Sequence, residues 1–251
     1  MYSNKEIINL IDLTLLDEKG GFDAVKALSQ KANALSTKVA SICIYPKFIE
    51  KARQELNKEI KIATVVNFPL GNDSKEKVME LTKEALNAGA DEIDMVIPYK
   101  NYLKMDQNKI HADEISIELV KALKAICGKK ILKVIIESGE LKDEKLIAQA
   151  SIDAVIAGAD FIKTSTGKTK NGASIKAAKI MLNTIKLLNK KGLTCGFKAS
   201  GGVRTKTQAE EYLNLAKDIL GEKFIDQKTF RFGASGLLDT LLTGEENQSS
   251  Y

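Results

Sequence analysis

Histidine is almost absent from this chain, because His111 is the only one among its 251 residues. His111 lies in a polar stretch before a predicted helix. A single histidine in such a place disfavours a Ser-His-Asp triad and a histidine-rich metal site. No pair of carboxylates stands at metal-binding spacing either. We therefore expect no metal site.

Cysteine is scarce too, and Cys43, Cys127 and Cys195 match no metal-binding spacing. Their odd number and apolar surroundings predict reduced, buried thiols, as in cytoplasmic proteins. Residues 1–6 lack the apolar segment of a signal peptide, and no apolar run approaches the roughly 18 residues of a membrane span. The sequence predicts a soluble, cytoplasmic protein that makes no contact with a membrane.

Aromatic residues make up only 6% of the chain and are scattered along it. The formal net charge of +5 comes from 38 Lys and Arg against 33 Asp and Glu, dispersed rather than gathered in blocks. A nucleic-acid-binding module usually has a basic stripe with aromatic residues between the basic ones. We therefore expect no nucleic-acid partner, and the small positive excess is compatible with an anionic small molecule.

Two glycine-rich nucleotide-binding motifs are also missing. No glycine fingerprint follows the first predicted strand, which disfavours a doubly wound sheet, although that fold remains the alternative. Gly167-Lys168-Thr169 resembles the end of a Walker A loop, but Ile162 stands where that loop needs its first glycine. A nucleoside triphosphatase is therefore disfavoured.

The chain does contain a regular alternation of helical and strand-like segments. Four predicted helices stop at a glycine, and a run rich in Ile, Val and Phe follows each glycine within a few residues. These helices span residues 74–88, 113–127, 143–157 and 174–191. In the second helix, Ile115, Leu119, Leu123 and Ile126 are predicted to share one apolar face.

Eight strands are predicted, and each is followed by a helical stretch. They span residues 11–13, 40–45, 62–67, 92–97, 131–137, 160–164, 195–200 and 230–233. Eight such units in about 250 residues match a TIM (β/α)8 barrel. Because no linker or shift in composition interrupts them, we predict one domain over residues 1–251, with a polar, mobile tail at 244–251.

Four predicted strands carry a charge in mid-strand: Lys133, Lys163, Lys198 and Asp94. Charges rarely lie in a core unless they are paired or functional. Residues 88–94 resemble residues 157–163, so Asp94 and Lys163 stand equally far after their glycines. Strands four and six of a barrel share layers. We therefore expect Asp94 and Lys163 to face each other at similar depth.

Lys163 is placed at the C-terminal end of its strand, where active sites of such barrels open. Burial, or the nearby ammonium of Lys198, would lower the pKa of Lys163 and make its amine a nucleophile. Asp94 could then move the protons required for Schiff-base chemistry on a carbonyl substrate. The alternative is that the lysines only form ion pairs with Asp94 and Glu137, an interpretation that fits Lys133 best.

Glycines follow the seventh and eighth predicted strands. Gly201 and Gly202 lie in the first of these loops, and Ser235 and Gly236 lie in the second, before an apolar helix at 237–242. Barrels often bind phosphate with these two loops, through backbone N–H groups and a helix N-terminus. The pair of loops predicts a phosphate-binding site.

These segments resemble those of one enzyme family. Residues 160–167, 196–204 and 92–94 are similar to the signatures of deoxyribose-phosphate aldolases, a family of class I aldolases. Residues 133–137, 42–46 and 231–235 also resemble it, so the similarity extends from about Asp12 to Ser235. The resemblance implies reversible cleavage of 2-deoxy-D-ribose 5-phosphate to acetaldehyde and D-glyceraldehyde 3-phosphate, without metal or cofactor.

The resemblance also implies roles for individual residues. Lys163 would form the Schiff base, Asp94 would donate and accept protons, and Lys198 would hold down the pKa of Lys163. Lys133 and Asp12 would support the site, and whether either takes part in the chemistry stays open. The phosphate would be held by Lys168 and by the backbones of Gly201, Gly202, Ser235 and Gly236.

The chain departs from the family pattern at two positions. Many relatives read Asp-His-Thr where residues 12–14 are Asp-Leu-Thr, so a role of that histidine does not transfer. Some members have two serines where this chain has Ser235 and Gly236, which leaves the contacts at Gly236 to the backbone.

The chain ends in Tyr251, as in members whose terminal tyrosine is thought to enter the site and assist proton transfer. A terminus without function is the alternative.

Other functions remain open at this point. A different Schiff-base barrel, such as a transaldolase or a sugar-bisphosphate aldolase, would use a three-carbon donor in place of acetaldehyde. A sugar-phosphate-binding barrel without catalysis is a further alternative. The sequence leaves the oligomeric state open between a monomer and a homodimer.

Overall fold

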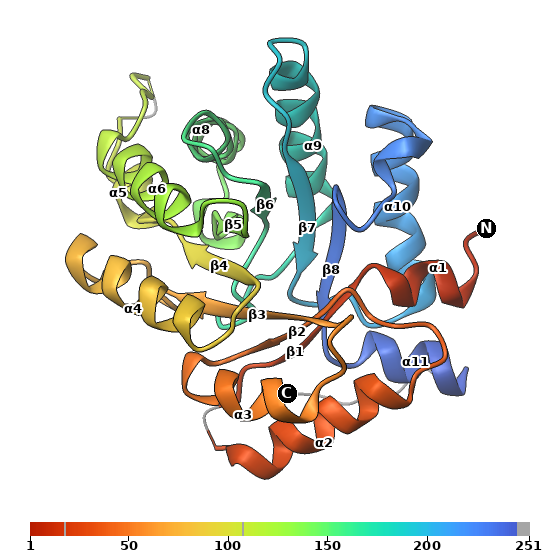
Figure 1. The fold of residues 1–251 in the computed structure, drawn as a ribbon. Coiled ribbons are helices and arrows are strands. Elements are labelled where there is room, and N and C mark those ends of the chain that lie inside the picture. Colours follow the sequence, from red (N-terminus) through yellow and green to blue (C-terminus); the bar gives the residue numbers. More distant parts are fainter. Residues whose placement is uncertain (18, 107, 245–251) are drawn as a thin grey trace.

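Eight parallel strands close into a barrel in chain order in the computed structural model, which describes residues 1–17, 19–106 and 108–244. The last strand pairs with the first, and helices surround the strands on the outside (Figure 1). The chain is a single-domain TIM (β/α)8 barrel, as predicted, and the doubly wound sheet is excluded.

All eight predicted strands are present, and no strand end differs from its prediction by more than two residues. The strands are β1 (Ile11–Leu15), β2 (Ser41–Ile44), β3 (Lys61–Val66), β4 (Glu92–Val96), β5 (Ile131–Ile135), β6 (Phe161–Lys163), β7 (Gly196–Ser200) and β8 (Phe230–Ala234). The tail, including Tyr251, lies outside the described residues from position 245 onward.

At least one helix follows every strand, and another helix precedes β1. The helices are α1 (Asn4–Asn9), α2 (Gly21–Ala34), α3 (Ile49–Glu55), α4 (Lys75–Asn87), α5 (Tyr99–Leu103), α6 (Glu114–Cys127), α7 (Ser138–Leu141), α8 (Glu144–Ile156), α9 (Ile175–Asn189), α10 (Lys206–Leu220) and α11 (Leu237–Thr243), with short 3-10 helices η1 (Pro46–Phe48) and η2 (Glu222–Phe224). Side chains of Ser74, Asp113, Asp143 and Ser174 accept hydrogen bonds from the first turns of α4, α6, α8 and α9. These caps fix where the four predicted helices begin.

The predicted apolar face of α6 was wrong in part. Ile115 is 66% exposed and Ile126 is only half-buried, whereas Val120, Leu123 and Cys127 are buried. With 3.6 residues per turn, Ile115 lies about 100° round the helix from the centre of this face. The barrel packs against the more continuous stripe of the helix, so Ile115 is left in solvent.

The inward side chains form layers of four, and each layer takes one residue from every second strand. Because the strands are tilted, the member of a layer lies two residues further along the chain than the residue in register with it two strands before. The layer from the even strands near the C-terminal end holds Cys43, Asp94, Lys163 and Gly233. The odd-strand layer beneath it holds Asp12, Ala63, Lys133 and Lys198, and the next even-strand layer holds Ser41, Glu92, Phe161 and Arg231. Each of these three layers thus contains charged side chains beside at least one small residue.

Candidate active site

Among the described residues, seven charged side chains point into the barrel, and each has 4% or less of its surface exposed. They are Asp12, Glu92, Asp94, Lys133, Lys163, Lys198 and Arg231, and we call them the charge cluster. Buried charges are very unfavourable unless they are paired. The barrel therefore holds one connected network of ion pairs where an ordinary barrel has apolar layers.

Asp94 is the centre of the charge cluster. Its Oδ2 lies 2.9 Å from Nζ of Lys163 and 2.8 Å from Nζ of Lys198, and its Oδ1 lies 2.8 Å from Nζ of Lys133. The prediction that Asp94 and Lys163 face each other is confirmed. Burial works to raise the pKa of Asp94, but the three surrounding lysines outweigh it and hold that pKa well below its usual range.

Lys133 and Lys198 have further carboxylate partners. Lys198 Nζ lies 2.5 Å from Oδ2 of Asp12. Lys133 Nζ lies 2.5 Å from Oε2 of Glu92 and 3.4 Å from Oδ2 of Asp12, although the Glu92 contact is not aligned as a hydrogen bond. Burial lowers the pKa of both lysines, but Asp12 and Asp94, and for Lys133 also Glu92, raise it by more. Both amines are therefore held in the protonated form.

Lys163 differs from the other two lysines, because Asp94 is its single carboxylate partner in the charge cluster. Burial lowers the pKa of Lys163, Asp94 opposes this, and the ammonium of Lys198 lowers the pKa further. The net shift is downward. Of the three buried amines, only that of Lys163, at the C-terminal end of β6, has a pKa that its surroundings lower.

Gly233 makes room for one of these lysines. A Cβ at this position would lie 3.0 Å from Cε of Lys198 and 2.7 Å from Oγ of Ser200. The missing side chain on β8 therefore lets Lys198 extend from β7 to Asp12 and Asp94. The position needs glycine for space rather than for backbone conformation.

The loop after β6 lies over the C-terminal end of the barrel. Glu137, which follows β5 in a left-handed conformation with φ 51°, accepts hydrogen bonds from the Thr166 N–H at 3.2 and 3.3 Å. Lys168 donates a hydrogen bond to the Leu16 carbonyl at 2.5 Å, which ties this loop to the end of β1. The Oγ of Ser165, two residues after Lys163, is buried with no hydrogen-bond partner among the described residues.

The predicted phosphate-binding residues lie on the same end of the barrel, after β7 and β8. Gly201 and Gly202 have φ of 85° and 105°, which favours glycine. A Cβ at Gly202 or Gly236 would meet no atom within 4 Å, so both backbones border open space. The fifth predicted residue, Lys168, contacts Leu16 rather than these loops.

Sequence reasoning missed Glu92 and Arg231 as members of the charge cluster. Arg231 Nη1 lies 2.5 Å from Oδ1 of Asp12, and Nη2 lies 3.1 Å from Oε1 of Glu92. Arg231 stands between Phe230 and Phe232 in mid-strand, so the rule that found the lysines could have found it. Glu92 begins its strand, where charges usually reach solvent, and gives no such signal.

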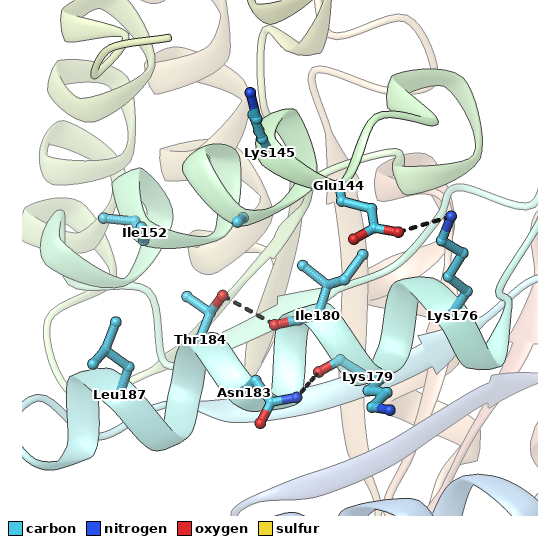
Figure 2. A pocket seen from close by; sticks show the side chains of 10 residues that line it. Glu144, Lys145, Ile152, Lys176, Lys179, Ile180, Asn183, Thr184 and Leu187 are labelled. Carbon is cyan, nitrogen blue, oxygen red and sulfur yellow. Dashed lines mark hydrogen bonds and ion pairs between the residues drawn. The ribbon is translucent and has the colours of Figure 1, made fainter.

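A groove on the outside of the barrel lies away from these residues. It runs between α8 and α9, has a volume of about 670 Å³, and is lined by Ile152, Ile180 and Leu187 (Figure 2). At one end Lys176 pairs with Glu144 at 2.8 Å. None of the charge cluster lines the groove, so it is not the candidate active site.

Two further expectations concern metals and membranes. In the part of the chain that the structure describes, no group of three or more His, Cys, Asp or Glu side chains is arranged to hold a metal ion. Within the same residues, no helix is long and apolar enough to cross a membrane. Leu13 is buried in the apolar core rather than in the charge cluster.

Comparison with known proteins gives a family and a fold. Residues 7–242 match the family described as DeoC/LacD family aldolase. A structure from Toxoplasma gondii ME49, provisionally named a deoxyribose-phosphate aldolase, is 27% identical, with a TM-score of 0.85 and coverage of 95% of this chain and 94% of that chain. The deoxyribose phosphate aldolase from Aeropyrum pernix, described as tetrameric, is 23% identical, with a TM-score of 0.74 and coverage of 97% and 94%. At that identity the second likeness indicates the fold alone.

Proposed function

This chain belongs to the DeoC/LacD family of aldolases, and from that premise we propose that it is a class I aldolase with Lys163 as its Schiff-base residue. The observation that carries the proposal is the contrast among the three amines around Asp94. Their carboxylate neighbours raise the pKa of Lys133 and Lys198, whereas burial and the Lys198 ammonium lower that of Lys163. An unprotonated amine is what attack on a carbonyl requires.

The proposed substrate is 2-deoxy-D-ribose 5-phosphate, cleaved to acetaldehyde and D-glyceraldehyde 3-phosphate. The Lys163 amine attacks C1 of the open-chain sugar, and loss of water gives a protonated imine. The electrons of the C2–C3 bond then move into the imine to form an enamine, while the C3 hydroxyl loses its proton and becomes the aldehyde of the three-carbon product. Protonation of the enamine at C2 and hydrolysis of the imine release acetaldehyde and the free amine.

In this proposal Asp94 moves protons at the imine nitrogen, which is supported by the distance of 2.9 Å between its Oδ2 and Nζ of Lys163. The same oxygen is 2.8 Å from Lys198 Nζ, which can resupply a proton. Lys133 and Asp12 support this arrangement by fixing the second oxygen of Asp94 and the Lys198 ammonium. We assign them no direct contact with substrate.

The proposed phosphate site combines the two loops after β7 and β8 with Lys168. The open backbones of Gly202 and Gly236 support it, as does the place of the loops on the same end of the barrel as Lys163. Lys168 would leave the Leu16 carbonyl to reach the phosphate. We also propose a cytoplasmic location, which the three free, buried cysteines support.

Borohydride trapping tests the nucleophile and the donor together. The protein is incubated with acetaldehyde, reduced and digested, and its peptides are mapped by mass spectrometry. We expect a two-carbon adduct on Lys163, its loss in Lys163→Met, and its retention in Lys176→Met, a surface control. Absence of the adduct, or an adduct confined to surface lysines, would overturn the proposal, and trapping only with a three-carbon ketone would assign another Schiff-base aldolase.

A further inference from the structure

The charge cluster contains one more cation than anions when every member is ionised. Four positive groups, Lys133, Lys163, Lys198 and Arg231, are buried with three negative groups, Asp12, Glu92 and Asp94. A net charge held away from water is strongly unfavourable. Loss of one proton leaves three cations and three anions, which balances the cluster.

The number of ion pairs decides which cation gives up its proton. Arg231 cannot, because a guanidinium stays protonated in proteins. Of the carboxylates in the described residues, three lie within 4 Å of Lys133 Nζ, two of Lys198 Nζ and one of Lys163 Nζ. The proton of Lys163 is therefore the one whose loss removes the fewest ion pairs.

Two other titratable groups face Lys163. Cys43 lies in the same layer on β2, and Glu137 follows β5. Burial raises the pKa of the Cys43 thiol, which stays neutral, and burial also raises the pKa of Glu137, although the Thr166 N–H and Lys163 oppose this shift. Neither group forms an ion pair or hydrogen bond with Lys163 among the described residues, so the charge balance is counted over the ion-paired groups of the charge cluster.

Glu92 and Arg231 set this balance from a distance. Arg231 donates to Asp12 through Nη1, to Glu92 through Nη2 and to the Gln227 carbonyl through Nε at 2.5 Å. Both side chains lie two layers below Lys163, and no ion pair or hydrogen bond joins either of them to it among the described residues. They act along two routes: from Arg231 through Asp12 and Lys198, and from Glu92 through Lys133, and both routes end at Asp94.

We propose that Glu92 and Arg231 are positioning residues that fix the charge balance of the cluster and so make Lys163 the amine that loses its proton before Lys133 and Lys198 do. The inference rests on the proposed function for the use of that amine as a nucleophile. The part of the inference that concerns the charge balance does not depend on catalytic activity. Arg231 supplies the permanent cation that makes one lysine proton surplus, and Glu92 supplies the third anion that keeps the other two lysines protonated.

Removing each charge separately, and then both, tests the proposal. In Arg231→Met three lysines face three carboxylates, so Lys163 keeps its proton and its titration midpoint rises. In Glu92→Gln, which preserves shape, three lysines and an arginine face two carboxylates, so the midpoint falls. In Glu92→Gln/Arg231→Met three lysines face two carboxylates, one lysine is again surplus, and the midpoint returns toward that of the unaltered protein.

The midpoint is read in two ways. NMR titration of lysines labelled with 13C and 15N, with Lys163 assigned by its loss in Lys163→Met, needs no substrate. The pH profile of borohydride trapping with acetaldehyde gives the same midpoint through imine formation. We expect Arg231→Met to raise it by about one pH unit or more, which is about a tenfold loss of unprotonated amine at a fixed pH below the midpoint, and Arg231→Lys to raise it less.

The outcomes separate this inference from the proposed function. If the unaltered protein traps acetaldehyde but neither single variant moves the midpoint, or the double variant fails to restore it, Glu92 and Arg231 are structural only. If Lys163 titrates as described but no imine forms, the Schiff-base function falls and the charge balance stands. Should Arg231→Met not fold, Glu92→Gln still decides the matter, because an unchanged or raised midpoint in that variant contradicts the inference.

Discussion

At the scale of single residues, the Lys168 amine has one partner in the structure and a different one in the proposed complex with substrate. Its amine contacts the Leu16 carbonyl, whereas the proposed function requires it to bind the phosphate of the sugar. An ammonium binds a phosphate more strongly than a neutral carbonyl, because both partners of that hydrogen bond are charged. Binding of the sugar phosphate is thus expected to release the loop after β6 from the end of β1.

We expect Lys168→Met to raise KM for 2-deoxy-D-ribose 5-phosphate by about tenfold or more, as loss of a charged hydrogen bond does. KM for unphosphorylated 2-deoxy-D-ribose and trapping of acetaldehyde on Lys163 should stay unchanged. Steady-state kinetics on both sugars measure this, with the exposed Lys170→Met in the same loop as control. An equal rise for both sugars would mean that Lys168 serves the loop and not the phosphate.

The sequence identified the charged residues of the site better than their partners. Lys133, Lys163, Lys198 and Asp94 could be found because each interrupts an apolar strand. That Asp94 faces Lys163 was also predictable, whereas the ion pairs of Lys133 and Lys198 with Asp12 and Glu92 depend on the shear of the closed barrel. That shear is a property of the closed barrel and is not written in any single segment.

At the scale of elements, the position of Lys198 inside the barrel depends on the space between β7 and β8. Gly233 on β8 borders Lys198 and Ser200 on β7. Because the contact is with side-chain atoms, an added methyl group can be accommodated by moving them. We therefore expect a methyl group at position 233 to disturb the active site more than the fold of the barrel.

We expect Gly233→Ala to lower kcat by about tenfold or more, because a displacement of the Lys198 ammonium of about 1 Å weakens its contacts with Asp12 and Asp94. KM should change little. Ser200→Ala is the matched control, since it removes the hydroxyl that the new methyl group meets first. If Gly233→Ala loses no activity in the Ser200→Ala background, the crowded partner is Ser200 and not Lys198.

The elements themselves were predictable to different extents. The strands followed from short apolar runs bounded by helices and glycines, and all eight were correct. The buried face of α6 was not, because Ile115 fits the helical period but lies outside the stripe that contacts the barrel. Periodicity defines which residues are neighbours on a helix, whereas the neighbouring elements decide which of them are covered.

At the scale of the whole molecule, the charge cluster makes the stability of the barrel depend on pH. The pKa values of Asp12 and Asp94 are held far below 3.8 by the surrounding lysines and, for Asp12, by Arg231, although burial opposes this. In the unfolded chain both groups take up protons near pH 3.8, whereas in the folded barrel they stay ionised. Their contribution is therefore fully present above about pH 4 and is lost as the pH falls below it.

Urea unfolding between pH 2 and pH 6 measures this dependence. Below pH 4 we expect the free energy of unfolding to fall by up to about 1.4 kcal/mol per pH unit for each of the two aspartates. Asp94→Asn should flatten this slope, because the amide has no proton to gain, whereas Glu118→Gln, in an exposed pair with Lys75, should leave it nearly unchanged. Lys163 acts at alkaline pH, because its pKa in the folded barrel lies below the value of 10.5 in the unfolded chain. As the pH rises from the folded to the unfolded pKa, the free energy of unfolding therefore increases. Equal acid slopes in Asp94→Asn and in the unaltered protein would mean that surface carboxylates, and not the charge cluster, govern acid unfolding.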